Sequence, residues 1–222
     1  MQKYTLREAM LSPFPCPSGM NETLHKLLIR RGVDSAEAAE RFLRPRFEQL
    51  SDPFLLSDMA VVVERLQTAL ERGEPICVYG DYDVDGVSAS AILADYLRAR
   101  GGNVEVYLPS RHEEGYGLNE RAVMSIAERA KLLVTVDCGV TNLNEVALAK
   151  RLGMDVIVTD HHRPGDRLPD CPTVNPLLNG YPFPYLCGAG VALRIVEALG
   201  GTEAALPYVD IAALRPARTA YR

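Results

Sequence analysis

Long apolar runs are missing from this sequence, and no stretch approaches the roughly 20 consecutive apolar residues that a membrane-spanning helix requires. Residues 1–8 also lack the apolar core of a secretion signal. These two absences argue against a membrane protein and against a secreted one. We therefore expect no membrane partner and a location in the cytoplasm.

Cysteine and basic residues are also scarce. The five cysteines are scattered and form no CxxC pair, so nothing in their spacing indicates a zinc site. Their odd number favours a reducing compartment, which again points to the cytoplasm. The net charge of −5 at pH 7 does not indicate a broad nucleic-acid-binding surface. A local basic groove or another domain could still hold a nucleic acid.

What is present is the composition of a folded protein, since 47% of the 222 residues are hydrophobic. The length fits one domain or one and a half. We expect residues 1–50 to form a small helical lead-in, because two short helical patterns, 21–31 and 36–43, follow a proline-rich start. Residues 51–222 are expected to form the main domain.

One stretch of the main domain organises the rest. The apolar run 76–79 ends at Gly80, and residues 86–100 are rich in helix formers. This order is typical of a strand, a loop and a helix. The loop between strand and helix carries aspartates at alternate positions: Asp81, Asp83 and Asp85.

The same pattern recurs further along the chain. The apolar runs 132–136 and 155–159 are followed at once by Asp137 and by Asp160-His-His162. An alternating segment, 104–108, and further helical patterns lie between them. Strands that alternate with helices predict an α/β fold in which helices flank a parallel sheet. Because parallel strands end at the same edge of a sheet, we expect the three acidic clusters to meet there.

These clusters suit metal binding. Closely packed carboxylates repel one another, and a divalent cation would remove that cost because hard cations prefer oxygen ligands. Carboxylates alone favour Mg²⁺, whereas an imidazole in the set shifts the preference toward Mn²⁺. Two adjacent ions could clamp the attacking and leaving oxygens of a phosphoryl displacement. The ligand types that fit such a pair are Asp83, Asp85, Asp137 and His161.

Simpler interpretations remain open for the same residues. Asp81 or Asp83 could cap the helix that follows, which aspartate does well. His162 directly follows His161, so we expect that the two rings cannot easily share a metal. His162 is then a donor or proton carrier at the phosphate, or else an ordinary loop histidine.

Three motifs together resemble the DHH phosphoesterases: Asp81-Tyr-Asp-Val-Asp85-Gly, Val136-Asp137-Cys-Gly and Asp160-His-His162. Three more segments narrow the resemblance to the RecJ-type exonucleases of that family: Arg41-Phe-Leu-Arg-Pro45, Pro109-Ser-Arg-His-Glu-Glu-Gly-Tyr-Gly-Leu118 and Cys187-Gly-Ala-Gly-Val-Ala192. The likeness runs from about residue 18 to residue 214. It implies degradation of single-stranded DNA from the 5′ end to mononucleotides with Mn²⁺ or Mg²⁺, in repair and recombination. It also implies a single-strand-binding protein and a helicase as partners.

The resemblance assigns roles to individual residues. The four metal ligands named above match the motifs, and His162 would act on the scissile phosphate. Asp81 and Asp160 would orient ligands or take part in catalysis. Arg111 could hold a phosphate by paired donors, or it is an ordinary surface arginine. Tyr116 could stack on a base, although a core or turn role suits it better. Backbone N–H groups at Gly188 and Gly190 could bind an anion of the substrate.

The end of the sequence departs from the family pattern. Residues 215–222 read Arg-Pro-Ala-Arg-Thr-Ala-Tyr-Arg where the family has a fourth motif with another metal-binding carboxylate. We therefore expect residues 51–222 to be a catalytic domain truncated before that motif, with the second domain of the family absent. Two alternatives stay open. One is a different DHH phosphoesterase that acts on short oligonucleotides, nucleoside bisphosphates or pyrophosphate. The other is a catalytically dead fragment that only binds metal or a partner.

Overall fold

The computed structural model describes residues 13–110, 115 and 117–214, and the chain divides into two compact units, Met1–Leu50 and Ser51–Arg222. The first unit contains helices α1 (Glu22–Arg30) and α2 (Ala36–Leu43) and a short 3-10 turn, η1 (Phe47–Gln49). Capping explains where both α-helices begin. The side chain of Asn21 accepts a hydrogen bond from the N–H of Thr23, and that of Ser35 accepts one from Ala38. A small apolar core joins the helices: Leu28, Val33 and Ala39.

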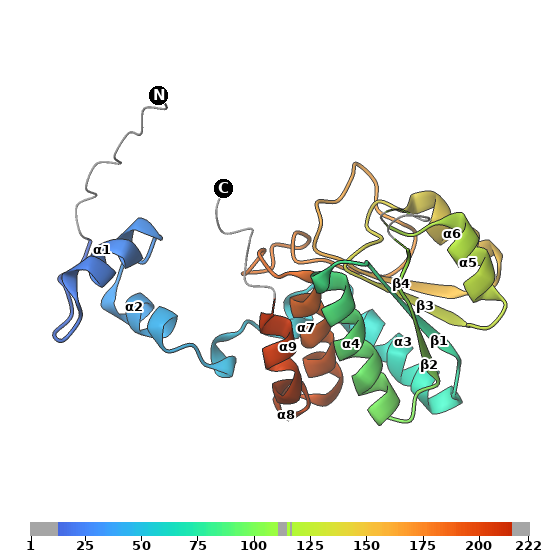
Figure 1. Ribbon diagram of the computed structural model, residues 1–222, viewed down its shortest axis with the longest axis horizontal. Coiled ribbons are helices and arrows are strands. Elements are labelled where there is room, and N and C mark those ends of the chain that lie inside the picture. Colours follow the sequence, from blue (N-terminus) through green and yellow to red (C-terminus); the bar gives the residue numbers. More distant parts are fainter. Residues whose placement is uncertain (1–12, 111–114, 116, 215–222) are drawn as a thin grey trace. The chain divides into compact units, whose positions relative to one another are not determined.

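A five-stranded parallel sheet forms the centre of the second unit, with strand order β2-β1-β3-β4-β5 (Figure 1). This confirms the predicted α/β fold. Every residue of β1 and β3 is buried. Parallel strands of this kind need helices on both faces of the sheet. The strands are β1 (Ile76–Gly80), β2 (Val104–Tyr107), β3 (Leu132–Val136), β4 (Asp155–Thr159) and β5 (Thr173–Val174).

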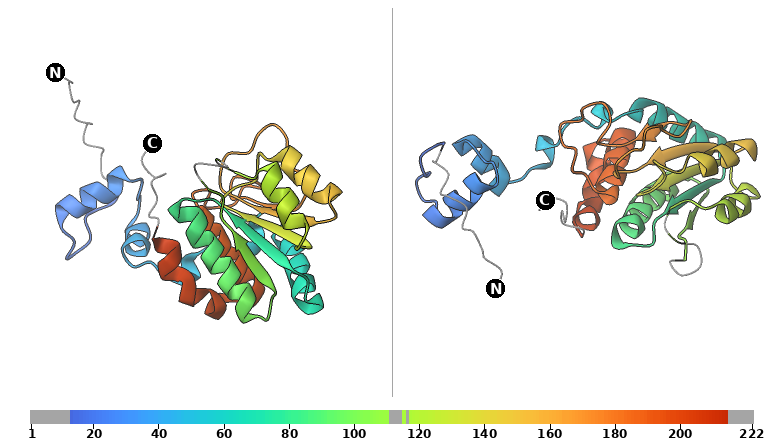
Figure 2. Two further views of the ribbon diagram at one scale, coloured as in Figure 1. Left: turned by 45° about the vertical axis from the view of Figure 1, so that its right-hand side comes forward. Right: turned by 90° about the horizontal axis from the view of Figure 1, so that it is seen from above.

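Helices cover both faces of the sheet (Figures 1 and 2). On one face, α5 and α6 pack on alternate strand residues such as Cys77, Leu133 and Val156, with which they share one apolar core. On the other face, α4 packs on α7, and α3 and α9 also contact α7. The helices of this unit are α3 (Met59–Arg72), α4 (Val84–Ala99), α5 (Glu120–Ala127), α6 (Leu143–Arg151), α7 (Gly188–Gly200), α8 (Thr202–Ala205) and α9 (Val209–Ala213), with 3-10 turns η2 (Pro53–Leu55) and η3 (Leu206–Tyr208). None of the helices in the described ranges combines the length and the hydrophobicity that a membrane span requires.

Two elements differ from the sequence-based expectation. Helix α4 begins at Val84 instead of residue 86, because the side chain of Asp83 caps it. Asp85 therefore belongs to the first turn of the helix and not to a loop. Strand β5 was not expected, since a strand of two residues is too short to produce an alternating pattern. It is defined by its pairing with β4 at the edge of the sheet.

Candidate metal centre

The three acidic motifs meet at the carboxyl edge of the sheet. Gly80, Val136 and Thr159 are neighbours across β1, β3 and β4, so the residues that follow them leave the sheet side by side. Two groups of side chains could each hold a metal ion, because in each group one ligand atom per residue lies within 4.8 Å of the others. The groups are Asp81, Asp83 and Asp137, and Asp137, His161 and His162.

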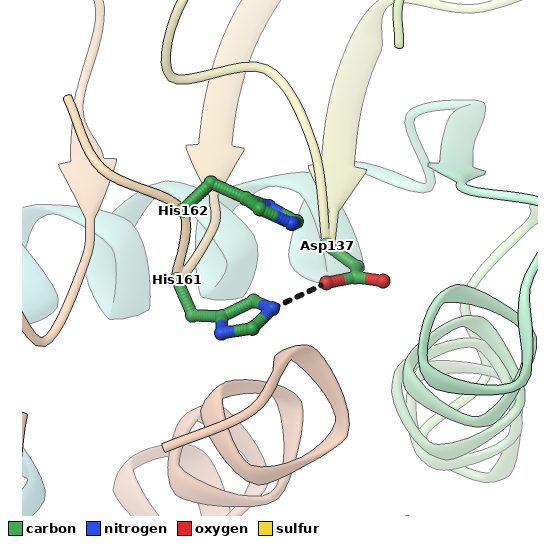
Figure 3. Close-up of side chains that lie close together, drawn as sticks. All are labelled: Asp137, His161 and His162. Atoms are coloured by element: carbon green, nitrogen blue, oxygen red, sulfur yellow. Dashed lines mark ion pairs between the residues drawn. The ribbon is translucent and has the colours of Figure 1, made fainter. Parts of the chain in front are cut away.

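Asp137 is common to both groups. Its side chain is 1% exposed, and its backbone has φ = 61°, a left-handed conformation that is uncommon outside glycine. Burial raises the pKa of its carboxyl to about 6, although the neighbouring His161 acts to lower it. Figure 3 shows the Asp137 carboxylate facing the ring of His161, and Oδ1 lies 3.0 Å from Nε2.

Asp85 is completely buried and lies next to the same imidazole, with Oδ2 at 3.4 Å from His161 Nε2. Its two oxygens accept hydrogen bonds of 2.8 Å from the N–H groups of Gly188 and Ala189, the first residues of α7. Burial would raise the pKa of Asp85, but these two backbone donors together with Cys187 and His161 lower it below its usual value. Asp85 therefore stays charged and ties α4 to the positive end of α7.

Asp83 caps helix α4, as the simpler interpretation of this residue proposed. Its Oδ1 accepts the N–H groups of Asp85 and Gly86 at 2.8 and 3.1 Å, which is a helix cap. It also belongs to the cluster with Asp81 and Asp137. The cap and the cluster are compatible, because a carboxylate has several acceptor positions.

Asp160 orients His162. Asp160 is 1% exposed, and its Oδ1 lies 2.8 Å from Nδ1 of the His162 ring and accepts the N–H groups of both histidines. Its Oδ2 accepts the N–H of Val140. Burial would raise the pKa of Asp160, but the bonds from His162 lower it. The same hydrogen bond raises the pKa of His162, so Asp160 favours a protonated ring and leaves Nε2 on the far side.

The geometry of the two histidine rings does not support the expectation that they cannot easily share a metal. The ring centroids of His161 and His162 are 4.4 Å apart, and both rings can contribute to one group with Asp137. Figure 3 shows both rings on the same side of the chain as that carboxylate. The physical reason is that β4 ends at Thr159, so the alternation of side chains along a strand no longer applies.

The glycines of α7 also have a different role from the one predicted. The N–H of Gly188 donates to Asp85 and that of Gly190 to Sγ of Cys187, which caps α7. The anion at this helix end is thus the Asp85 carboxylate and not a substrate group. A Cβ at position 188 would lie 2.6 Å from Cβ of Asp137, so glycine there allows the helix to approach the site. Arg111 and Tyr116 lie outside the described residues.

Sequence reasoning missed Asn175. It is fully buried after β5, and its Nδ2 donates to the carbonyl of His162 at 2.9 Å. The signal was the one used elsewhere, a polar residue directly after a strand, but β5 was too short to be found. Asn175 fixes the backbone that carries the second histidine.

The donor set fits a divalent metal ion. Oδ1 of Asp137 and Nε2 of His161 are buried, and neither makes a hydrogen bond of acceptable geometry within the described part of the chain. Buried polar atoms without a hydrogen bond cost folding free energy, and a cation coordinated by both atoms would satisfy them. Oxygen ligands with one or two imidazoles suit Mn²⁺ and Mg²⁺.

Comparisons with known proteins identify the family of this chain. Residues 75–214 match the model of the "DHH family, N-terminal domain". The chain belongs to the DHH family. It is 42% identical over 205 residues to the single-stranded-DNA-specific exonuclease RecJ of Bacillus subtilis, a match that covers 88% of this chain and 26% of that protein.

Solved structures of RecJ are also similar. A crystal structure of exonuclease RecJ bound to manganese matches with a TM-score of 0.67 and 39% identity, over 71% of this chain and 42% of that one. RecJ of Thermus thermophilus in complex with Mg²⁺ matches with a TM-score of 0.55 and 28% identity, over 83% of this chain and 22% of that one. The chain spans between 26% and 34% of the length of the first curated relatives that it matches.

Proposed function

We propose that this chain carries the metal-binding catalytic site of a RecJ-type nuclease, which hydrolyses single-stranded DNA from the 5′ end to mononucleotides with Mn²⁺ or Mg²⁺. The convergence of Asp137, His161 and the 81–85 loop at one sheet edge carries this proposal. The likeness to relatives named single-stranded-DNA-specific exonucleases supports the substrate. The 5′ polarity and the role in repair and recombination rest on that likeness alone.

The residues of the site divide into two kinds by their contacts. The ligands to metal would be Asp83, Asp85, Asp137 and His161, and His162 lies near enough to join them. A bound divalent ion would supply Lewis acidity at a phosphoryl oxygen and lower the pKa of an attacking water. Asp160 orients the ring of His162 through the bond to Nδ1, and Asn175 holds the backbone carbonyl of His162.

His162 is the residue best placed to handle a proton. Its side chain is 44% exposed, in contrast to the buried carboxylates beside it. Asp160 accepts at Nδ1 and keeps the ring charged over a wider pH range. Nε2 can then donate to a phosphate oxygen or to the leaving 3′ oxygen.

The proposal extends to the surroundings of the enzyme. We propose that it works in the cytoplasm, as the absence of a secretion signal in residues 1–8 favours. The family resemblance suggests a single-strand-binding protein and a helicase as partners. The main alternative within the family is cleavage of short oligonucleotides, nucleoside bisphosphates or pyrophosphate. The second alternative is a site that binds metal but hydrolyses no substrate.

Metal binding is tested first, on the purified 222-residue chain. We expect the signal of free Mn²⁺ in electron paramagnetic resonance to fall as the chain is added, and Asp137→Asn to weaken the binding at least about tenfold. Asp170→Asn is the matched control, because Asp170 is an exposed carboxylate paired with Lys150 away from the site. Equal Mn²⁺ affinity in the Asp137 variant and the unchanged chain would reject the site.

Substrate class is tested next. The same chain receives a 5′-phosphorylated single strand, the same strand as a duplex, a dinucleotide and pyrophosphate, each with Mn²⁺. Release of mononucleotides from the single strand, faster than from the duplex, supports the proposal. Turnover of the dinucleotide or pyrophosphate alone favours the other phosphoesterase class, and tight Mn²⁺ binding without any turnover favours the inactive fragment.

A further inference from the structure

Two exposed aromatic side chains stand on the segment between β5 and α7. Phe183 is 51% exposed and Tyr185 is 61% exposed. Their rings contact each other edge to face, with centroids 5.7 Å apart and an interplanar angle of 77°. Such a pair is costly to leave in water, since each ring could bury a large apolar area.

The segment is attached to the metal centre at both ends. At its start, Asn175 donates to the carbonyl of His162. At its end, Cys187 caps α7, and the next N–H, that of Gly188, donates to Asp85. Tyr185 is three residues before Gly188, so its Cα lies within about 11 Å of that residue even if the chain is fully extended. Figure 1 shows the segment in orange beside the start of α7.

The middle of the segment is also held in place. Tyr181 is 5% exposed, and the nearby side chain of Arg194, which is 1% exposed, acts to lower the pKa of its hydroxyl against the effect of burial. Arg194 in turn donates to the carbonyl of Ser51 and pairs with Glu197. Phe183 and Tyr185 therefore lie between a buried tyrosine and a helix cap. Their position is preorganised, which lowers the entropic cost of binding a ligand there.

We propose that Phe183 and Tyr185 form a stacking platform for the bases of the single strand whose phosphate lies at the metal centre. This inference rests on the proposed nuclease function and adds a substrate-binding surface to it. A base stacks on an aromatic ring whatever its identity, because every base has a π-face. The platform would thus hold the strand without selecting a sequence. It would also recognise bases, and not only the phosphates that metal and basic residues recognise.

The test compares two probes that differ only in their bases. One is a fluorescein-labelled thymidine 12-mer, and the other is a 12-mer of abasic sites with the same phosphates. Affinities are measured by fluorescence anisotropy with Ca²⁺ in place of Mn²⁺. We expect the unchanged chain to bind the thymidine strand at least about fivefold more tightly, since stacking contributes about 1–3 kcal/mol per base. The double variant Phe183→Ala/Tyr185→Ala is expected to lose that preference.

Two further variants and one measurement keep the result interpretable. Tyr185→Phe retains the ring and should retain the preference. Leu177→Ala removes an exposed apolar side chain from the same segment. It should change neither the affinity for the thymidine strand nor that for the abasic strand. Mn²⁺ affinity of the double variant should equal that of the unchanged chain, which shows that the site is intact.

Three outcomes would overturn the platform. A double variant that still prefers the thymidine strand rejects it while leaving the nuclease proposal standing. A double variant that changes only the oligomeric state, measured by light scattering, shows instead that the aromatic pair contacts another copy of the chain. An unchanged chain that neither binds nor hydrolyses single-stranded DNA rejects both proposals.

Discussion

At the scale of single residues, Asp137 combines three features that each raise the free energy of the folded state. It is buried, its backbone has a positive φ of 61°, and its carboxylate lies near Asp85 and Asp83. Backbone strain and a shifted pKa persist where the surroundings impose them, and they gather at functional sites. A cation would offset the electrostatic part of this cost, which is why we interpret the residue as a metal ligand.

Replacement of Asp137 by Asn should stabilise the metal-free chain above pH 6. Because burial raises the pKa of Asp137 from 3.8 to about 6, the folded state holds a proton that the unfolded state releases. The contribution of Asp137 to stability is then greatest below about pH 4 and falls as the pH rises to about 6. Asn removes this loss and tolerates positive φ. Chemical denaturation at about pH 7.5 should show a gain of up to about 3 kcal/mol.

The same pair of proteins provides the control for this prediction. At about pH 4 the stability difference should vanish, because Asp137 is then protonated in the unchanged chain. Addition of Mn²⁺ should stabilise the unchanged chain more than the variant, because the variant binds the ion more weakly. A variant that is less stable than the unchanged chain at neutral pH would contradict the argument that the charge of Asp137 destabilises the metal-free fold.

Replacement of Asp160 by Asn should lower the pKa of His162. The carboxylate raises that pKa through the bond to Nδ1. An amide oxygen can keep the bonds from the histidine N–H groups but not the charge, and the amide nitrogen cannot accept the N–H of Val140. The Asp160–His162 pair stabilises the fold below about pH 6.5, and this contribution is lost as the pH rises through the raised pKa of His162. Titration of the His162 ring by NMR measures the change. Asp166→Asn, an exposed carboxylate nearby in the sequence, is the control.

At the scale of elements, the site depends on how closely α7 approaches the sheet. The first two N–H groups of α7 hold Asp85, which belongs to the first turn of α4. These two helices thus share a buried charge. Removing one partner of such a pair costs far more than the pair itself contributes.

Gly188→Ala should therefore damage the site, whereas Gly190→Ala should not. A Cβ at position 188 would lie 2.6 Å from Oδ1 of Asp137, but at position 190 the nearest atom is Cδ2 of Leu186 at 3.3 Å, the end of a flexible side chain. We expect the first variant to lose about 1–3 kcal/mol of stability and at least about tenfold in Mn²⁺ affinity. The second should stay within about 1 kcal/mol, because alanine favours a helix. Calorimetric titration and thermal unfolding measure both, and equal behaviour of the two variants would contradict the packing argument.

At the scale of the whole molecule, the net negative charge opposes binding of the proposed substrate, single-stranded DNA. A net charge of −5 repels a polyanion, so the local cations beside the site become important. Arg163 directly follows His162, is exposed, and makes no ion pair within the described residues.

Arg163→Gln should weaken binding of single-stranded DNA and reduce its salt dependence. If Arg163 neutralises one phosphate, the slope of log affinity against log salt concentration should fall by about 0.7. Anisotropy at several salt concentrations measures the slope. Arg151→Gln is the control, because it removes an exposed cation from the end of α6. The same loss of slope in both variants would assign the effect to net charge and not to Arg163.

The sequence by itself determined the alternation of strands β1 to β4 with helices and the edge at which the acidic motifs meet, but not strand β5. The apolar runs 132–136 and 155–159 are the strands β3 and β4, because both faces of a buried parallel strand must be apolar. It also located Asp137 and the two histidines, since a residue that follows such a strand lies at its carboxyl end.

Only the tertiary structure decided what each group does there. It showed that the N–H groups of α7 hold Asp85 instead of a substrate anion, that both histidine rings can reach Asp137, and that Asn175 supports His162. Each of these contacts joins residues far apart in the sequence or beyond the end of a strand. Local patterns carry no information about them, because they depend on how the elements pack and not on the residues of any one element.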